Sequence, residues 1–527
     1  MPPILKKEYK GYPVAWNVGG MTYNPLVALY DTGSSKRTTS EIHGNIRLEY
    51  DFKDIHPWLQ GLKVAIFGNY NYSHTNTGMF TDAPYVMTVD SNFGEPTLMV
   101  KGGYGGSDET KLRGFLRASS EGDNWKIQPQ ITYNRDFGKH GVNLLFLYEA
   151  QKSTSHNFQT SARGYMTNDP IDISLGAEIV PNTTVGGHEH ESQVSYAGRL
   201  NYDFDEKYLV EFAFRYDGSY KFAPENRWGF FPSVSAGWVM SRESFIKDNA
   251  PWISFLKLRA SWGQSGKDNV TPYLYNSTFN MTTTTSAVYN GNAYKLFYTN
   301  NQYVYRDLKW QTTNTYNIGL DFDVLNYKLG AEIDVFYQYT NDIIESRAGY
   351  YPSSLGGFYP SMRNSGSVDN RGIDLTVKHQ LQVSKDFNYR IRGIFGFARN
   401  KVLSQILTDS YPSYRAILGH PMGARYGLIA TGLFQTQEQI DNAPASPSTS
   451  GVLRLGDIMY KDTNGDGIIS YKGTNSDYVK IGYGSLPEIS FSLNMDFNYK
   501  DFYLNMLGQG VTHVDYELLG SWGIASS

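Results

Sequence analysis

The chain has 527 residues, a formal net charge of −4 at pH 7 and no cysteine. Without cysteine the chain has no disulfides, thiol catalysis or cysteine-ligated metals, and its mild, unclustered charge argues against nucleic acid as a partner. Glycine and tyrosine are abundant, at 52 and 42 residues, and no apolar run reaches the roughly 18 residues of a transmembrane helix.

The dominant pattern is alternation of apolar and polar side chains, which is the period of a β-strand with two different faces. In residues 193–217, Tyr196 and Leu200 share one face, and after a polar turn at 205–207 the alternation resumes at Tyr208. This predicts an antiparallel hairpin whose arms have about ten residues, the length of a tilted strand that crosses a bilayer. In chain order the predicted strands are 44–54, 62–72, 127–135, 142–148, 193–204, 208–217, 230–240, 254–262, 316–324, 327–339, 371–383, 387–397, 489–499 and 502–508.

These roughly fourteen strands predict an all-β protein, and the placement of charge helps to choose between two architectures. In a membrane barrel the apolar face contacts lipid and the charged face lines the interior, because an arginine at mid-bilayer costs about 2–4 kcal/mol. Arg199, Arg215, Glu332 and Asp334 all alternate to the face opposite the aromatic residues. The pattern therefore favours an antiparallel transmembrane β-barrel segment with long extracellular loops. A soluble sandwich, with a second apolar sheet over the aromatic face, stays open.

Several longer segments carry a family resemblance. RYDGSYKFAPENRWGFFPSVSAGW at 215–238 is followed by LKLRASWGQSGKDN at 256–269, and NRGIDLTV lies at 370–377. GHPMGARYGLIATGLFQTQEQID occupies 419–441, and GDIMYKDTNGDGIIS at 456–470 leads to SLPEISFSLNMDFNYKDFYLNMLGQG. Together they resemble the SusC/RagA-like branch of TonB-dependent outer-membrane transporters, from about residue 20 to about residue 515.

The resemblance implies the pore wall of an outer-membrane importer, and not an enzyme. Such importers take up oligosaccharides or peptides with a SusD-like surface lipoprotein, lie in outer-membrane lipid, and use the TonB system to move a plug domain. Their barrels have about 22 strands, so the chain resembles part of a barrel without a plug domain or cofactor. Its expected parts are barrel strands with loops in 1–402, a long extracellular loop region in 403–485, and further, truncated strands in 486–527. A secreted all-β glycan-binding or adhesion protein is the alternative.

One segment resembles a metal site. DTNGDG matches the opening of a calcium-binding loop, with oxygen ligands from Asp462, Asn464 and Asp466 at positions 1, 3 and 5 and glycine at position 6. The twelfth position is Gly473 and not glutamate, so the bidentate ligand is missing unless Asp477 replaces it in a longer loop. An Asx-rich turn explains the same residues without a metal, and we favour that interpretation over a weak calcium site.

The remaining site candidates have simpler explanations. His188 and His190 offer two imidazoles on one strand face, but the glycine-rich sequence before them predicts a solvated loop without a third ligand. In the long loops, Trp310 or Tyr426 could stack on a sugar, although loop aromatics more often fold the loop upon itself. No nucleophile–base pattern supports an enzyme.

Overall fold

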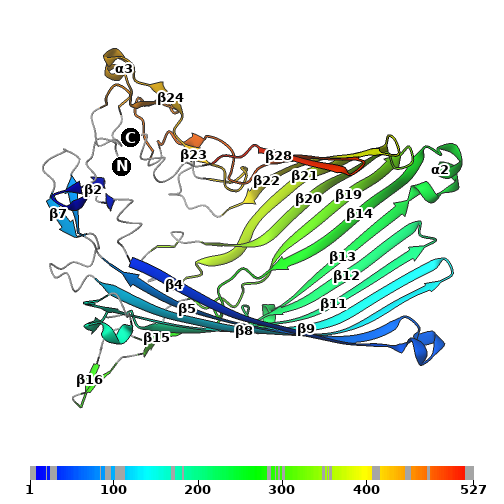
Figure 1. Ribbon diagram of the computed structural model, residues 1–527, viewed down its shortest axis with the longest axis horizontal. Helices are drawn as coiled ribbons and strands as arrows, with labels where there is room; N and C mark the ends of the chain where they lie inside the picture. Colours follow the sequence, from blue (N-terminus) through cyan, green and yellow to red (C-terminus); the bar gives the residue numbers. More distant parts are fainter. Residues whose placement is uncertain are drawn as a thin grey trace. The chain divides into compact units, whose positions relative to one another are not determined.

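The computed structural model describes residues 8–18, 21–23, 33–82, 85–89, 97–100, 113–167, 172–180, 183–281, 287–290, 292–294, 297–299, 303–346, 351–352, 354, 359–405, 416–445, 453–471 and 475–516. Antiparallel strands dominate these residues (Figure 1), and none of their helices is both long and apolar enough to cross a membrane.

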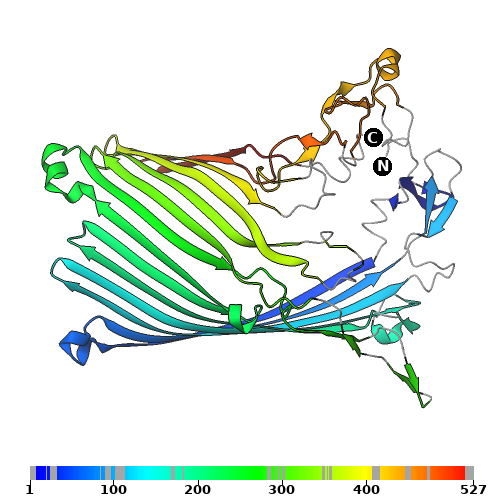
Figure 2. The ribbon, with the colours of Figure 1, turned by 180° about the vertical axis from the view of Figure 1, so that it is seen from behind.

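One large sheet contains the long strands, and fourteen of its fifteen strands follow the hydrogen-bonded order β28-β27-β22-β21-β20-β19-β14-β13-β12-β11-β9-β8-β5-β4. The fifteenth, β10 (Glu178–Ile179), pairs with β9. Each long strand therefore lies beside the next long strand along the chain, as Figure 2 shows from behind. Their bounds are β4 (Gly33–Asp51), β5 (Leu62–Thr81), β8 (Gly114–Phe137), β9 (His140–Arg163), β11 (Val185–Phe204), β12 (Tyr208–Ser219), β13 (Trp228–Val239), β14 (Ile253–Lys267), β19 (Gln311–Val324), β20 (Leu329–Ser346), β21 (Met362–Gln382), β22 (Phe387–Ser404), β27 (Ile489–Tyr499) and β28 (Phe502–Thr512).

All fourteen predicted strands are confirmed, but several are much longer than predicted. β8 and β9 each have 24 residues and β21 has 21, about twice the 9–11 residues that a tilted strand needs to cross a bilayer. The sequence marks only the inner part of each strand, where one face is apolar. In the outer part of β9, residues 151–157 read QKSTSHN and are polar on both faces, so hydrophobic periodicity gives no signal there.

The chain divides into two compact units, of which the first contains residues 1–50, 65–129 and 148–194. This unit includes most of β4 and β5, parts of β8, β9 and β11, and a small sheet in which β2 pairs with β1, β3 and β6, and β6 pairs with β7. Phe80 and Tyr165 form a small buried core with Ala162. The small-sheet strands are β1 (Glu8–Tyr9), β2 (Tyr12–Val18), β3 (Met21–Tyr23), β6 (Tyr85–Val89) and β7 (Thr97–Val100).

The second unit contains residues 51–64, 130–147 and 195–527. Its strands from β14 to β28 are joined alternately by long and short connections. Residues 325–328, 383–386 and 500–501 make short turns at one end, whereas the β14–β19 and β22–β27 connections at the other end are long. Outer-membrane barrels have short periplasmic turns and longer extracellular loops, which assigns the two ends of this sheet.

Short elements occupy the connections. Helix α2 (Ser244–Asn249) lies between β13 and β14, and α3 (Gln437–Asp441) begins at a capping box formed by Thr436 and Gln439. The short ladders pair β15 (Phe279–Met281) with β18 (Phe297–Thr299), β16 (Ala287–Tyr289) with β17 (Asn292–Tyr294), β23 (Tyr426–Gly427) with β26 (Val479–Lys480), and β24 (Ala430–Leu433) with β25 (Ile458–Tyr460). The 3-10 helices are η1 (Phe52–Asp54), η2 (Pro57–Leu59), η4 (Ile173–Leu175), η5 (Pro224–Asn226) and η6 (Met240–Arg242).

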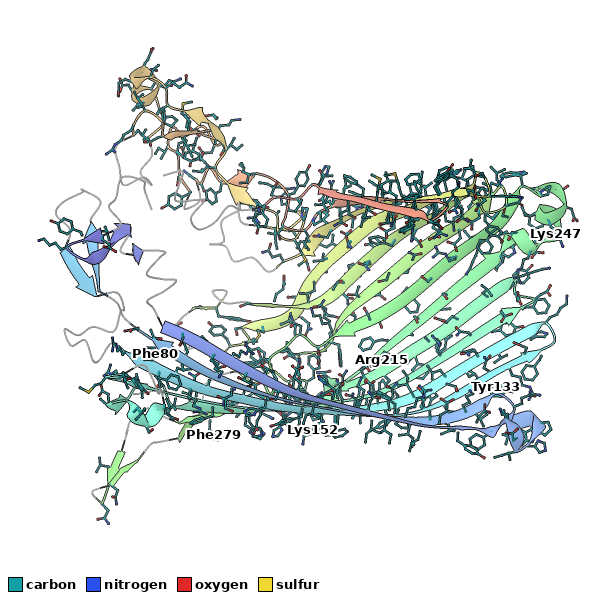
Figure 3. The ribbon with its side chains drawn as sticks, viewed as in Figure 1. Phe80, Tyr133, Lys152, Arg215, Lys247 and Phe279 are labelled. Carbon is teal, nitrogen blue, oxygen red and sulfur yellow. The ribbon has the colours of Figure 1, made fainter. Side chains whose placement is uncertain are left out.

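The second unit's sheet has one apolar face and one polar face, and side chains project from both (Figure 3). On the apolar face, Ile318 on β19 is directly opposite Val335 on β20, and the two residues remain 63% and 53% exposed. Trp262, Tyr316 and Tyr337 form an aromatic row on this face toward the long connections. Near the short turns, Tyr389 contacts the rings of Phe387 and Phe497, and Phe387 contacts Tyr499. Aromatic residues at both edges of an exposed apolar band are typical of a lipid-facing barrel wall.

Candidate functional site

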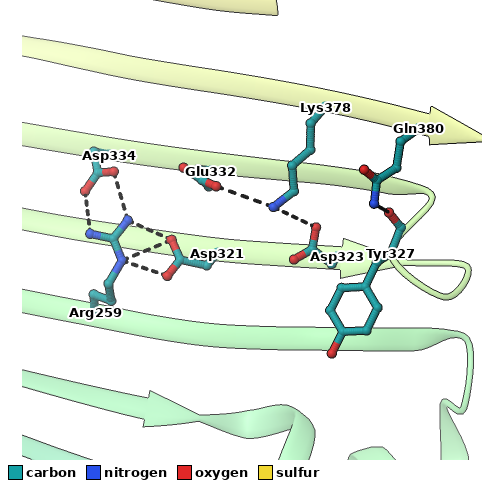
Figure 4. Close-up of polar contacts among 8 residues, drawn as sticks. All are labelled: Arg259, Asp321, Asp323, Tyr327, Glu332, Asp334, Lys378 and Gln380. Atoms are coloured by element: carbon teal, nitrogen blue, oxygen red, sulfur yellow. Dashed lines mark hydrogen bonds and ion pairs between the residues drawn. The ribbon is translucent and has the colours of Figure 1, made fainter. Parts of the chain in front are cut away.

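The polar face of the second unit carries two ion-pair clusters near the short turns (Figure 4). In the first, Arg259 on β14 donates to Asp321 on β19, with Nη2–Oδ1 at 2.7 Å, and to Asp334 on β20, with Nη2–Oδ2 at 2.9 Å. The guanidinium reaches Asp334 by passing over Gly319 on β19, where an added Cβ would lie 2.7 Å from Arg259 Cζ. A glycine is therefore needed at this crossing.

The second cluster repeats this arrangement one strand further along the sheet. Lys378 on β21 lies with its Nζ 3.0 Å from Asp323 Oδ1 on β19 and 3.5 Å from Glu332 Oε1 on β20. The lysine stem passes over Gly330 on β20, where an added Cβ would collide with both Lys378 and Asp323. The side chains of Arg259 and Lys378 thus each link two strands that are not hydrogen-bonded neighbours.

The two clusters border one hollow of about 370 Å³, which Phe255 completes. Two cations and three carboxylates line it, so the wall of this hollow has a formal charge of −1. Two larger hollows, of about 500 and 550 Å³, lie on the same polar face. Their linings include Asn201, Glu211, Lys257 and Asn317 in one, and Asn388, Arg390, Asp496 and Asn498 in the other. This face can bind polar groups and water, and it brings together no nucleophile–base pair among the described residues.

The long connections fold against the polar side through a second, apolar core. Trp310 is only 8% exposed and its ring lies 5.5 Å from Phe222 and 5.3 Å from Phe231, measured between centroids. Its indole N–H donates to the Arg227 carbonyl at 3.1 Å. Trp310 therefore stabilises the loop and presents no ring face to a sugar. Tyr426 is half-buried, and its hydroxyl donates to the Ala416 carbonyl at 3.4 Å.

The DTNGDG segment forms a tight turn that its own side chains stabilise. The Asp462 carboxylate accepts from the N–H of Gly465 at 2.6 Å and of Gly467 at 2.7 Å. Asn464 and Asp466 each accept from the N–H two residues onward, at 2.9 Å. Across the described residues, no group of three or more His, Cys, Asp or Glu side chains is arranged to hold a metal ion. Calcium binding at Asp462, Asn464 and Asp466 stays a prediction.

Asp477 anchors both ends of this turn from a fully buried position. Its Oδ1 accepts from the Thr463 N–H at 2.8 Å, and its Oδ2 accepts from the Ser470 N–H at 2.7 Å. Burial opposes ionisation, but hydrogen bonds from the Ser470 and Thr463 backbone and the Thr463 hydroxyl outweigh it and place the pKa of Asp477 below its usual 3.8.

Acid is therefore expected to loosen this turn. Because the folded pKa of Asp477 is below the unfolded one, its carboxylate contributes stability above pH 3.8 that is lost as the pH falls further. In Asp477→Asn this acid-dependent loss should disappear, and the turn should be looser at neutral pH by about 1–3 kcal/mol, because an amide cannot accept from both sides. Hydrogen exchange of residues 462–470 from pH 6 to pH 3 measures both effects. Asp441→Asn, in exposed α3, should retain the acid-dependent loss, and an unchanged pH profile in Asp477→Asn would contradict the assignment.

The predicted loop around His188 and His190 is wrong, because both residues lie inside β11. Polar residues on both faces hid this strand extension. The structure also adds His156 from β9, whose ring centroid lies 3.8 Å from that of His188, and the His190 centroid lies 4.0 Å from that of His188. Desolvation and the two neighbouring imidazoles lower the pKa of His188, which favours a neutral ring at this position.

Comparisons with known proteins agree with this architecture. The family model described as TonB dependent receptor-like, beta-barrel, matches residues 7–521. TonB-dependent receptor P3 of Formosa agariphila is 27% identical over 524 residues, which cover 94% of this chain and 47% of that protein. TonB-dependent receptor SusC of Bacteroides thetaiotaomicron is 26% identical over 517 residues, which cover 92% of this chain and 46% of that protein. The chain thus spans about half the length of the curated relatives it matches.

Solved structures share the fold. The RagAB peptide importer in its closed-closed state superposes with a TM-score of 0.70 at 17% identity, covering 94% of this chain and 50% of that chain. Its open-open state gives a TM-score of 0.68 at 18% identity, covering 91% of this chain and 48% of that chain. The predicted all-β barrel architecture and the SusC/RagA resemblance are confirmed, and with them the outer-membrane location. Since the family model spans nearly the whole sequence, the chain belongs to the TonB-dependent receptor-like β-barrel family.

Proposed function

We propose that this chain forms the pore wall of a TonB-dependent outer-membrane importer of oligosaccharides or peptides that works with a SusD-like surface lipoprotein. The observation that carries the proposal is the two-faced sheet of the second unit. Its outward face exposes Ile318 and Val335 between aromatic rows, whereas its inward face holds the ion pairs of Arg259 and Lys378. An importer needs this division, because the wall must contact lipid outside and hydrated solute inside.

The polar face supports a substrate that is rich in hydrogen-bonding groups. Amide, carboxylate and guanidinium groups line the two larger hollows, and such groups complement both sugar hydroxyls and peptide bonds. The structural neighbour RagAB is named a peptide importer, and the family resemblance implies oligosaccharides as the other substrate class. Energy coupling would act through a plug domain that fills the lumen and contacts TonB, as the family resemblance implies.

The secreted glycan-binding or adhesion alternative is less well supported. A soluble sandwich would cover the aromatic and aliphatic face with a second sheet. Among the described residues of the second unit, that face instead remains exposed at Ile318, Val335 and Leu258. An uncovered apolar band of this kind belongs in lipid.

Uptake in the native host tests the proposed function. A strain without the gene should fail to take up one of two labelled pools, either mixed oligosaccharides or mixed peptides, and a plasmid copy should restore uptake. Restored uptake should stop when an uncoupler dissipates the proton-motive force, because TonB coupling depends on it. Normal uptake of both pools in the deletion strain, or restored uptake that is insensitive to the uncoupler, would contradict the proposal.

A further inference from the structure

The aromatic row on the outward face continues into two arginines. Tyr337 on β20 is directly opposite Arg371 on β21, which is in turn directly opposite Arg399 on β22. β21 and β22 are joined by the short turn at 383–386. A tilted strand needs 9–11 residues to cross a bilayer. Counting that many residues from the turn along either strand ends just before these arginines. Arg371 and Arg399 therefore lie at the extracellular interface, where lipid headgroups begin.

Arg371 belongs to the lipid-facing side of its strand. β21 pairs with β22 without irregularity from Val368 to Gln382, so its odd-numbered side chains share one face through this stretch. Val377 on that face is 41% exposed, whereas Asn370 on the other face donates to the inward Gln338 at 3.2 Å. Arg371 is exposed on the outward face, where its apolar stem can lie along the wall while the guanidinium reaches the headgroups.

The charges on this face are incompletely matched. Arg399 donates through Nε and Nη2 to Glu488, at 3.0 and 2.6 Å, and Lys401 is directly opposite Asp369 in the next row outward. Within the described part of the chain, the Arg371 side chain makes no hydrogen bond or ion pair. Three cations thus face two carboxylates, and the unmatched cation is directly opposite another arginine, an arrangement that is unfavourable unless an anion lies between them.

We propose that Arg371 and Arg399 bind the phosphate of an outer-leaflet lipid headgroup. A guanidinium presents two parallel N–H donors that fit two phosphate oxygens, and two opposed guanidinium groups can hold one phosphate between them. The anion removes the like-charge conflict that the bare row contains. Trp262, Tyr316 and Tyr337 lie in the same row and contact the same interfacial layer. The aromatic rings can therefore contact the lipid's acyl chains while the arginines bind its headgroup. The site depends on the outer-membrane location and not on the import function.

Lipid retention by the complete protein, purified from its host's outer membrane in mild detergent, tests this site. Native mass spectrometry would follow binding of monophosphoryl lipid A and of its dephosphorylated form. The wild type should retain the phosphorylated form preferentially, and Arg371→Gln should weaken that retention about tenfold, which corresponds to the loss of one charge-assisted hydrogen-bond pair. Lys385→Gln is the matched control, because it removes one positive charge from the same hairpin at the opposite membrane interface.

A variant that is expected to strengthen lipid retention controls for losses caused by misfolding. Glu488→Gln frees Arg399 from its carboxylate and should strengthen retention of the phosphorylated lipid, which a damaged barrel could not do. Equal retention of both lipids by the wild type, or equal losses in Arg371→Gln and Lys385→Gln, would overturn the proposal. Full competition by inorganic phosphate at the concentration of the lipid would also overturn it, because the site would then bind free phosphate and not a headgroup.

Discussion

Replacing Trp310 with alanine is expected to lower the free energy of unfolding by about 3–5 kcal/mol, the usual loss for a buried tryptophan. Trp310 packs between Phe222 and Phe231 and donates its indole proton to the Arg227 carbonyl. Truncation therefore leaves a cavity in the core of the long connections and an unpaired carbonyl. Urea unfolding of the detergent-folded protein, followed by far-UV circular dichroism, measures the change.

Trp58→Ala is the matched control for this substitution. Trp58 is 67% exposed in the η2 turn, so the same chemical change should cost less than about 1 kcal/mol there. Equally small losses at the two positions would show that the cluster around Trp310 does not stabilise the fold. In that case the ring would be free for another use, including contact with substrate.

An arginine introduced at Ile318 is expected to destabilise the membrane-inserted barrel by about 2–4 kcal/mol, the cost of this side chain near the bilayer midplane. Ile318 lies near the middle of the span between the turn at 325–328 and the long connection before β19. Its side chain is on the outward face opposite Val335. Folding into lipid vesicles over a urea series, with protease protection as the readout, measures the loss.

Thr315→Arg provides the opposite expectation on the same strand. Thr315 is directly opposite Gln338, on the polar face that carries the ion pairs, so an arginine there meets water and carboxylates and should cost little. A larger loss at Thr315 than at Ile318 would reverse the two faces of the sheet. Equal, small losses would mean that neither face contacts lipid, and the barrel assignment would fail.

The sequence was sufficient to locate the strands that cross the membrane. In each of them one face must be apolar, so a period of two appears at positions such as Ile318, Leu320 and Phe322, and the resemblance supplied the family. Strand ends were not predictable beyond the membrane. There neither lipid nor a packed core selects apolar residues, and this is why the extension of β11 across His188 and His190 was missed.

The candidate site was only partly accessible to the sequence. Alternation placed Glu332 and Asp334 on the polar face, but it could not show which cation each carboxylate meets. The strand register and the glycines at 319 and 330 determine which ion pairs form. Arg259, for example, reaches Asp334 only over Gly319. Likewise, the sequence identified the DTNGDG turn, whereas burial of Asp477 beneath it came from tertiary packing.

The unequal connections between neighbouring strands make the sheet tolerant of change at one end and intolerant at the other. Closing a longer loop costs only about 0.6 kcal/mol for each doubling of its length, so whole inserted segments between Ser404 and Ile489 would leave the β22–β27 pairing almost unaffected. The turn at Lys500 and Asp501 has no such freedom. Deleting one residue there would slip β28 by one position against β27 and exchange its lipid-facing and lumen-facing side chains. Variation among descendants of this gene should therefore accumulate on the cell's exterior, while the periplasmic hairpins keep their length.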